Sequence, residues 1–225
     1  MPGTACGAVM PANPKPDTLP LIRALKKLYP KHIIPLHHAN AWQLLCAVIL
    51  SAQCTDARVN TITPALFAAY PTPQALAQAD IQAVEKIIHS AGFYHSKALS
   101  LIESSRRICD VFGGEVPQNM ADLLSLRGVA RKTANVMLGD YFKKPEGIVV
   151  DTHVKRLAYR LGLTGQTDPV KVEKDLTGVI PYRYWGWIAI ALILHGRQVC
   201  NARRPLCSQC PLRPLCPRKG VKISA

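Results

Sequence analysis

Apolar residues recur along this chain at helical spacing, and strand-like alternation is almost absent. Several apolar stretches follow residues that cap helices, such as Asn40, Thr55 and Asp80, or begin with proline in the first turn. The last long stretch is apolar nearly all round, which predicts a buried helix. The predicted helices are Ala41–Ser51, one after Thr55, one from Pro73, Ile81–Ser90, Ser96–Val111, Met120–Leu126, Arg131–Phe142, Thr152–Leu161, one from Pro169 and Tyr184–Val199. About ten short helices with tight links make an all-α protein.

Two segments depart from the helical pattern. Residues 1–16 are of low complexity, and we expect residues 1–19 to form a leader without fixed structure. The loop Lys143-Lys144-Pro145-Glu146-Gly147 contains turn residues between two predicted helices, so it is the best candidate for an internal boundary.

The chain carries a large excess of positive charge. It has 28 Lys and Arg against 14 Asp and Glu, a formal net charge of +14 at pH 7. No single lysine-rich tail accounts for the excess, which therefore predicts a polyanionic partner, with nucleic acid as the main candidate. A basic surface without a partner is the alternative.

Export and membrane signals are absent from the sequence. The start lacks the charged and apolar regions of a signal peptide, and the most apolar run, Trp187–Leu194, is too short to cross a bilayer. We expect a soluble, cytoplasmic protein in a reducing compartment, with no membrane partner. Four cysteines are then ordinary thiols: Cys6, Cys46, Cys54 and Cys109.

The other four cysteines crowd near the C-terminus as Cys200-x6-Cys207-x2-Cys210-x5-Cys216. The residues between them, rich in arginine and proline, bury little apolar surface, so a bound inorganic group has to organise the loop. Zinc sites with four cysteines usually pair two short Cys-x2–4-Cys arms, whereas this loop has a single one. Spacing alone leaves zinc and an iron–sulfur cluster both open.

The segment Leu124–Val136 places a glycine turn between two predicted helices. Gly128 permits the positive φ that such a turn needs, and the amides of Gly128, Ala130 and Arg131 would point outward to bind a phosphate. Lys132 falls in the first turn of the second helix, where the helix dipole and Arg131 disfavour its ammonium form. We therefore expect a lowered pKa for Lys132 and a nucleophilic amine. A phosphate clamp is the alternative role.

Asp151 carries a carboxylate that we expect to lie at the same level as Lys132, because the chain doubles back between the two residues. The helix after Lys132 rises for about ten residues, roughly 15 Å at 1.5 Å per residue. The segment Gly147–Asp151 then runs back extended, at about 3.3 Å per residue. A carboxylate beside such a lysine pairs a nucleophile with its base. Asp151 can also cap the following helix, and it can fill both roles.

Together these residues resemble a known family. The hairpin Gly128–Val136, the tetrad Val150-Asp151-Thr152-His153 and the cysteine spacing are similar to those of endonuclease III, a helix–hairpin–helix DNA glycosylase and AP lyase with a [4Fe–4S] cluster. The segments Leu50–Asp56 and Gly92–Lys97 are also similar, and the match spans roughly residues 20–217.

The resemblance implies two helical domains with a DNA cleft between them. One is a helical barrel, residues 35–144, with the helix–hairpin–helix at about 119–142; the other, residues 20–34 plus 145–225, holds the [4Fe–4S] cluster. It also implies a monomer that acts near the nucleoid on double-stranded DNA with a damaged base or an abasic site.

Residue roles follow from the same resemblance. Lys132 is the attacking amine, Asp151 the catalytic carboxylate, Gln53 the residue that fills the gap left by an extruded nucleotide, and Phe93 the wedge in the opposite strand. For Gln53 and Phe93 the alternatives are a helix-end polar group and a core aromatic. His153 is placed to touch a phosphate or to be a structural histidine. The remaining implied residues are Lys97, Arg127, Gly128, Ala130 and Arg131 for DNA, and Cys200, Cys207, Cys210 and Cys216 for the cluster.

The hairpin and the wedge depart from the family pattern. The hairpin usually reads Leu-Pro-Gly-Val-Gly, whereas here Arg127 replaces the proline and Ala130 the second glycine. The Ala130 Cβ atom lies near the expected phosphate, and the charge of Arg127 can compensate. Phe93 stands where the family commonly has an aliphatic residue.

The resemblance implies a reaction in which Lys132 displaces an oxidised base, forms a Schiff base with the sugar and cuts the strand by β-elimination. A monofunctional mismatch glycosylase is a second hypothesis, although such enzymes usually lack a lysine at position 132. A DNA-binding or electron-transfer protein that uses its cluster without chemistry is a third.

Overall fold

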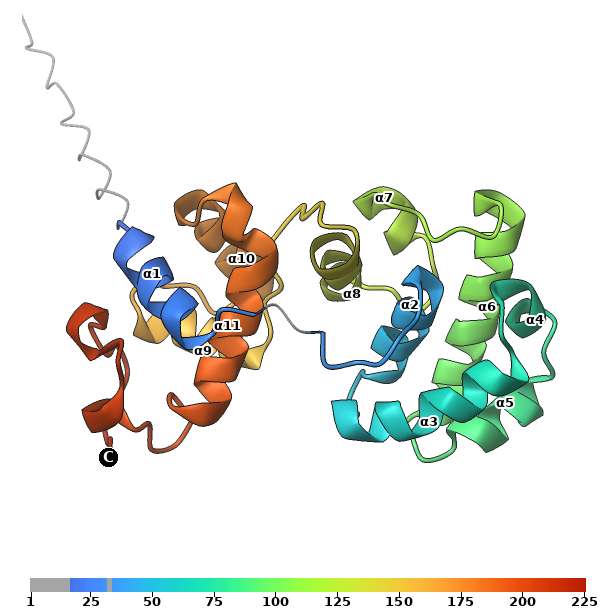
Figure 1. Cartoon of the computed structure of the whole chain (residues 1–225), viewed down its shortest axis with the longest axis horizontal. Coiled ribbons are helices and arrows are strands. Elements are labelled where there is room, and N and C mark those ends of the chain that lie inside the picture. Colours follow the sequence, from blue (N-terminus) through green and yellow to red (C-terminus); the bar gives the residue numbers. More distant parts are fainter. Residues whose placement is uncertain (1–16, 32–33) are drawn as a thin grey trace, which may run out of the picture.

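The computed structural model describes residues 17–31 and 34–225, and all regular elements in these ranges are helical, which confirms the expected all-α fold (Figure 1). The α-helices are α1 (Leu19–Leu28), α2 (Ala41–Leu50), α3 (Asp56–Ala69), α4 (Pro73–Ala77), α5 (Ile81–Ile88), α6 (Tyr94–Phe112), α7 (Met120–Leu124), α8 (Arg131–Val136), α9 (Thr152–Arg160), α10 (Pro169–Val179) and α11 (Trp185–Gln198). A π-helical segment, Met137–Tyr141, continues α8, and 3-10 turns lie at Tyr182–Tyr184, Cys207–Gln209 and Arg213–Leu215.

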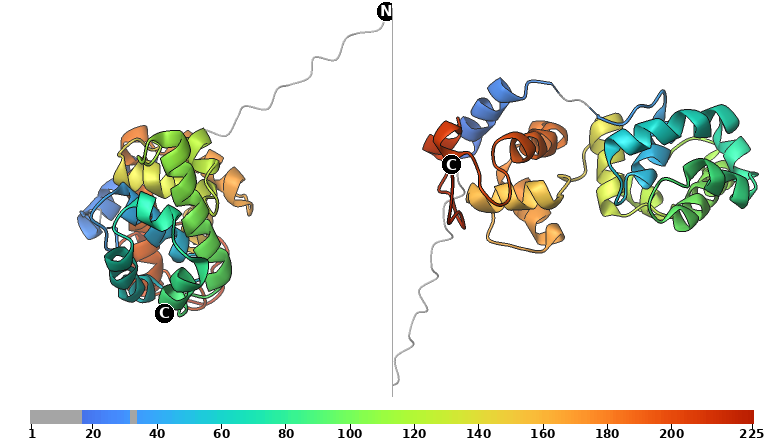
Figure 2. Two further views of the ribbon diagram at one scale, coloured as in Figure 1. Left: turned by 90° about the vertical axis from the view of Figure 1, so that its right-hand side faces the viewer. Right: turned by 90° about the horizontal axis from the view of Figure 1, so that it is seen from below.

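The helices form two lobes with separate apolar cores (Figures 1 and 2). The first lobe, α2–α8, buries residues such as Leu45 and Met137. The second lobe joins α1 to α9–α11 and the C-terminal segment, and buries Leu25 and Leu192. Val136, at the end of α8, packs against both cores. The hairpin helix α8 therefore lies where the lobes meet.

Local sequence signals fix where most helices begin. The predicted caps accept a hydrogen bond from the amide three residues further on, as in Asp151 with Val154 N at 2.8 Å. The predicted caps Asn40, Thr55, Asp80 and Asp151 are confirmed. Thr72, Asn119 and Asp168 cap their helices in the same way. Some bounds differ from prediction: α6 begins before Ser96 because left-handed Phe93 precedes it, and α5 and α7 end early, at Ile88 and Leu124.

The predicted helix Arg131–Phe142 is a single α-helix only as far as Val136. The π-helical segment that follows brings Gly139 against Gly186 of α11, where a Cβ on Gly186 would lie 3.0 Å from Gly139 O. Backbone contact between the lobes at these two glycines accompanies the widened turn. The predicted helix therefore extends almost to its expected end, at Tyr141, but its second half has π-helical hydrogen bonding, which no local pattern encodes.

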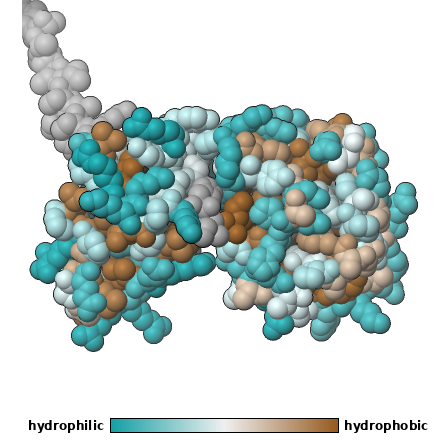
Figure 3. Space-filling model, viewed as in Figure 1, coloured by the Kyte–Doolittle hydropathy of each residue, from teal (hydrophilic) through white to brown (hydrophobic). Residues whose placement is uncertain are grey.

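Helix α1 begins inside the expected leader. Residues 1–16 lie outside the described residues, but Leu19 opens α1, and the buried Thr18 hydroxyl donates to Val179 O at 2.8 Å. The end of the expected leader thus belongs to the second lobe. On the face in Figure 3, hydrophilic residues are spread over both lobes with apolar residues between them. No described helix is both long and apolar enough to cross a membrane.

Candidate active site and cysteine loop

The turn between α7 and α8 requires a glycine. Gly128 has φ +78°, and a Cβ atom there would lie 2.8 Å from Ser100 Cβ on α6. Both the backbone conformation and the packing therefore exclude a side chain. Ala130 is the exposed N-cap residue of α8 and makes no side-chain cap, so the first amides of α8 lack that acceptor. These are the amides that the sequence predicts to bind phosphate.

Lys132 and Asp151 line one pocket of about 290 Å³. Lys132 is exposed in the first turn of α8, on the first lobe, and Asp151 is the N-cap of α9, on the second. The chain thus brings the two residues together across the junction of the lobes. The residues that line the pocket are Lys132, Val150, Asp151, Thr152, Lys155 and Pro169.

The Asp151 carboxylate has one oxygen occupied and one available. Its Oδ1 accepts the capping hydrogen bond from Val154 N at 2.8 Å, and Oδ2 has no partner among the described residues. Asp151 therefore caps α9, as the sequence allowed, and its second oxygen is still an acceptor available in the pocket. Lys155, absent from the predicted site, brings a second amine. Its spacing of four residues from Asp151, one helical turn, was the signal in the sequence.

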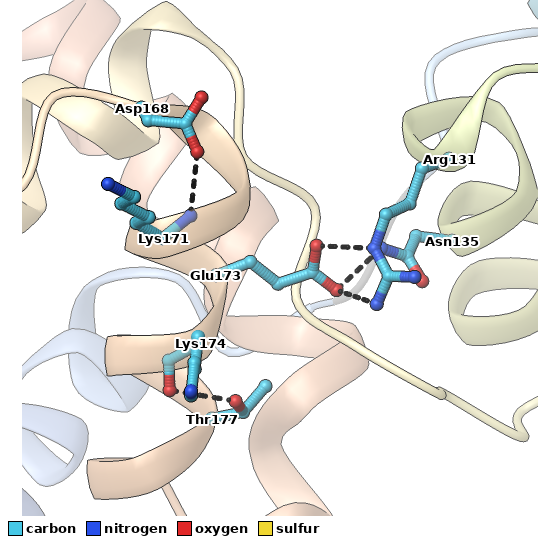
Figure 4. A network of polar contacts seen from close by, with 7 residues as sticks. All are labelled: Arg131, Asn135, Asp168, Lys171, Glu173, Lys174 and Thr177. Carbon is cyan, nitrogen blue, oxygen red and sulfur yellow. Dashed lines mark hydrogen bonds and ion pairs between the residues drawn. The ribbon is translucent and has the colours of Figure 1, made fainter.

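Arg131 is paired with a carboxylate of the second lobe, although its side chain is 46% exposed (Figure 4). Its Nε and Nη2 donate to Glu173 Oε2 and Oε1 of α10 at 2.9 and 3.1 Å, and this hydrogen bonding raises the pKa of Arg131. The guanidinium charge that was expected to act on Lys132 and on DNA is therefore matched by a buried carboxylate.

Gln53 and Phe93 lie on two touching loops with unusual backbone conformations. Their φ angles are 53° and 60°, in the left-handed region that non-glycine residues seldom adopt. A Cβ on Gly92 would lie 3.8 Å from Gln53 O, so the loops are in contact. Phe93 is 67% exposed, which excludes the core-aromatic alternative. Exposed side chains on strained backbone are typical of functional sites.

Lys97 is a correction to the predicted DNA contacts. Its side chain is buried, and Nζ donates to Leu50 O at 2.9 Å. Burial lowers the pKa of Lys97. The ammonium group satisfies the C-terminal end of α2, which leads into the Gln53 loop. Lys97 therefore supports the Gln53 loop from inside the first lobe, and its side chain does not reach the surface.

His153 and Arg127 also have protein partners. His153 Nδ1 lies 3.1 Å from Arg156 Nη2. The pKa of His153 is lowered, mainly by burial, with Arg156 and Arg197 adding to the effect and Asp151 opposing it. Arg127 is exposed and pairs with Glu103 at 3.2 Å. Its exposed position beside the hairpin leaves it accessible to a phosphate.

The four C-terminal cysteines line one pocket. Arg160, buried beside it, donates to Cys200 Sγ at 3.3 Å and to the carbonyls of Asn201 and Ala202 at 2.7 and 2.8 Å. Burial and the neighbouring thiols raise the pKa of Cys210, so four thiolates need a positive centre among them. This donor set fits a bound metal centre, although no three His, Cys, Asp or Glu side chains among the described residues are grouped so as to hold a single ion. The cysteines that line the pocket are Cys200, Cys207, Cys210 and Cys216.

An all-α fold with a glycine hairpin, a lysine at the start of its second helix and an aspartate across the pocket defines a helix–hairpin–helix repair protein. In agreement, residues 46–181 match the HhH-GPD superfamily of base excision DNA repair proteins. The chain is 52% identical to endonuclease III of Synechocystis sp. over 206 residues, covering 92% of this chain and 94% of that protein. It is 41% identical to endonuclease III of Bacillus subtilis over 196 residues, 87% of this chain and 89% of that protein.

Solved structures give the same result. A trapped endonuclease III–DNA covalent intermediate, an estranged-adenine complex, superposes with a TM-score of 0.82 at 39% identity, covering 88% of this chain and 92% of that one. The chain belongs to the endonuclease III family, which confirms the resemblance of the sequence motifs.

Proposed function

We propose that this chain, a DNA glycosylase and AP lyase of base excision repair, removes oxidised pyrimidines from duplex DNA through a Schiff base on Lys132. The observation that carries the proposal is the pocket that Lys132 shares with Asp151. An amine and a carboxylate with a free oxygen, facing one cavity, supply the nucleophile and the base of the reaction.

In the proposed reaction the Lys132 amine attacks C1′ of an extruded nucleotide. The glycosidic C–N bond breaks and the base leaves with its electron pair, while Asp151 Oδ2 accepts a proton from the amine. Opening of the sugar ring gives the Schiff base. Loss of a proton from C2′ then expels the 3′ phosphate, which cuts the strand by β-elimination. Unstacking costs least for a damaged base, which favours its extrusion.

The role of Lys132 is tested by borohydride trapping on duplex DNA with a single abasic site. The parent protein should form a covalent complex with the DNA, and Lys132→Gln should form none. Trapping by the Lys132→Gln protein at the parental level would refute the assignment.

The role of Asp151 is tested by Asp151→Asn, because asparagine still caps a helix but accepts no proton. We expect a folded protein that loses most of its turnover. Asp80→Asn is the matched control, since Asp80 caps α5 through the same bond, from Ala83 N at 2.9 Å, and is absent from the pocket. Equal turnover in the two variants would reduce Asp151 to a cap.

The DNA partner in this proposal is a duplex with a damaged base or an abasic site, gripped between the lobes. Exposed Gln53 and Phe93 fill the extruded position and wedge the opposite strand, and the hairpin with Gly128, Ala130 and Arg127 holds a phosphate. The net charge of +14 supports a polyanionic partner. A panel of duplexes with thymine glycol, dihydrouracil, an abasic site or a mismatch tests the substrate class, and activity confined to mismatches would contradict it.

We propose a [4Fe–4S] cluster as the cofactor, held by Cys200, Cys207, Cys210 and Cys216. Their shared pocket supports this, as does Arg160, which ties the loop to α9. The cluster would supply the bonds that organise a loop with little core of its own. Purified protein should contain iron and sulfide in equal amounts, and Cys207→Ser should lose both. A stoichiometric zinc content would contradict the proposal.

The division of the chain in this proposal follows the two cores except at Ile34, which packs against the core of the first lobe. Residues 35–144 form the barrel domain with the helix–hairpin–helix, and residues 20–34 plus 145–225 form the cluster domain. We propose that the protein acts as a monomer in the cytoplasm, at the nucleoid. Sedimentation with and without duplex DNA tests the monomer.

A further inference from the structure

The two reactive residues of the proposed site belong to different lobes. Lys132 opens α8 and Asp151 precedes α9. Residues 142–151 between the π-helical segment and α9 form no regular element. A loop of this kind fixes the position of neither lobe, so the placement of the amine against the carboxylate depends on contacts across the junction.

One cluster makes such a contact directly beside Lys132: Glu173 and Asn135 are buried in it, and the partly exposed Arg131 covers them (Figure 4). Glu173 of α10 is 7% exposed and accepts two hydrogen bonds from Arg131, at 2.9 and 3.1 Å. Asn135 Nδ2, one turn further along α8, donates to the same Oε1 atom at 3.0 Å. A bidentate pair from arginine to a carboxylate is the strong, directional form of this interaction.

Two neighbours of Glu173, Asn135 and Gly147, accommodate its carboxylate. Asn135 Oδ1 is buried and has no hydrogen-bond partner among the described residues, because the amide directs its Nδ2 to Glu173. A Cβ on Gly147 would overlap Glu173 Oε1, so the interlobe loop has room for the carboxylate only because residue 147 is a glycine. The interaction is thus accompanied by a buried acceptor without a partner among the described residues and by a glycine whose replacement would displace the Glu173 carboxylate.

The cluster is connected to both walls of the pocket. Arg131 directly precedes Lys132 on one wall. Pro169, which lines the other, lies four residues before Glu173 and hence on the same face of α10. A displacement of Glu173 relative to Arg131 would therefore move the two walls apart.

We propose that Arg131, Glu173 and Asn135 form an interlobe latch, a set of positioning residues that holds the Lys132 amine against Asp151 for Schiff-base formation. The latch rests on the proposed function and deepens it. It assigns the Arg131 guanidinium to Glu173 of the second lobe, in place of the DNA contact that the hairpin sequence suggested.

The test measures two quantities on Arg131→Gln, Glu173→Gln and Gly147→Ala: the single-turnover rate of borohydride trapping at saturating protein, and the slope of log affinity against log salt. A misplacement of about 1 Å costs on the order of 100-fold in rate. We expect all three variants to trap at least about 10-fold more slowly, with an unchanged salt slope. Gly147→Ala leaves the charged residues intact, and melting temperatures identify any variant that is unfolded at the assay temperature.

Two comparisons sharpen the outcome. Glu103→Gln breaks an exposed Arg–Glu pair of similar length that does not span the lobes, and should trap at the parental rate. Arg131→Gln leaves Glu173 as an unpaired buried charge, so adding Glu173→Gln should recover part of the lost rate. A phosphate contact of Arg131 would instead lower the salt slope by about 0.9 and give no recovery.

Parental trapping rates in the three variants, or a reduced salt slope in Arg131→Gln, would overturn the latch. The proposed function fails separately, if Lys132→Gln traps like the parent. A Lys132→Gln protein that does not trap, together with latch variants that trap normally, refutes the latch alone.

Discussion

Replacing Gly128 by alanine should lower both the stability of the protein and its affinity for DNA. An L-residue in the left-handed region costs roughly 1–2 kcal/mol, and Gly128 has φ +78°. The added Cβ would also lie 2.8 Å from Ser100 Cβ, which is attached directly to the backbone of α6 and cannot rotate away as the far end of a long side chain can. Overpacking of this kind costs about 1–3 kcal/mol. The expected loss in the free energy of unfolding is therefore about 2–5 kcal/mol.

Urea unfolding followed by circular dichroism measures this loss, with Gly113→Ala as the matched control. Gly113 has φ +62°, but a Cβ there meets nothing within 4 Å, so this variant should lose only the conformational part, about 1–2 kcal/mol. The difference between the variants is the clash with Ser100. Affinity for an abasic duplex should fall in folded Gly128→Ala, because the turn has to open beside the hairpin amides, and should stay unchanged in Gly113→Ala. Equal losses of stability in the two variants would refute the packing argument.

Three further predictions concern lysine and histidine side chains. Lys97→Met removes the donor to Leu50 O and should destabilise the protein by about 1–3 kcal/mol in urea unfolding. The same change should slow base extrusion, because the Gln53 loop loses its support. An unchanged free energy of unfolding would contradict the role of Lys97. Lys155→Gln should weaken binding to abasic DNA and lower the salt slope by about 0.9, as for one lost phosphate contact, with the trapping rate at saturation retained. Because burial lowers the pKa of His153, the unfolded state binds the proton of this histidine more tightly than the folded state does. The free energy of unfolding should therefore fall as the pH drops below about 6.5, and His153→Gln should lessen that fall. Identical pH profiles of stability in the parent and in His153→Gln would disprove this prediction.

Those features that depend on short stretches of chain were predictable. A cap such as Asp151 needs only an amide three residues on, and the Gly128 turn needs only a positive φ. The closeness of Asp151 to Lys132 was also predictable. The helix after Lys132 and the extended segment before Asp151 have comparable lengths and opposite directions, so the chain ends near where it began. Most of the fold, and the pocket that Lys132 and Asp151 share, follow from such local rules.

Features that depend on tertiary contacts were not predictable. Lys97 sits in a motif that suggests a DNA contact, yet the carbonyl that it binds is 47 residues away in sequence. Arg131 lies next to Lys132 in a basic run, and only the packing of α10 supplies its partner, Glu173. A charged residue in a sequence motif carries no sign of whether solvent or a distant carboxylate faces it.

The two groups of the proposed reaction, Lys132 and Asp151, are held by constraints of different range. The Asp151 carboxylate is fixed by a main-chain amide of its own helix, so its place in the second lobe is set locally. The Lys132 amine extends from α8, whose position relative to that lobe depends on Glu173 and on the glycine contact at residues 139 and 186. Asp151→Asn therefore changes proton transfer without moving either group, whereas a latch variant moves the amine without changing proton transfer. Slower trapping in both variants, with a changed pH dependence of the rate in Asp151→Asn alone, would separate chemistry from positioning in this active site.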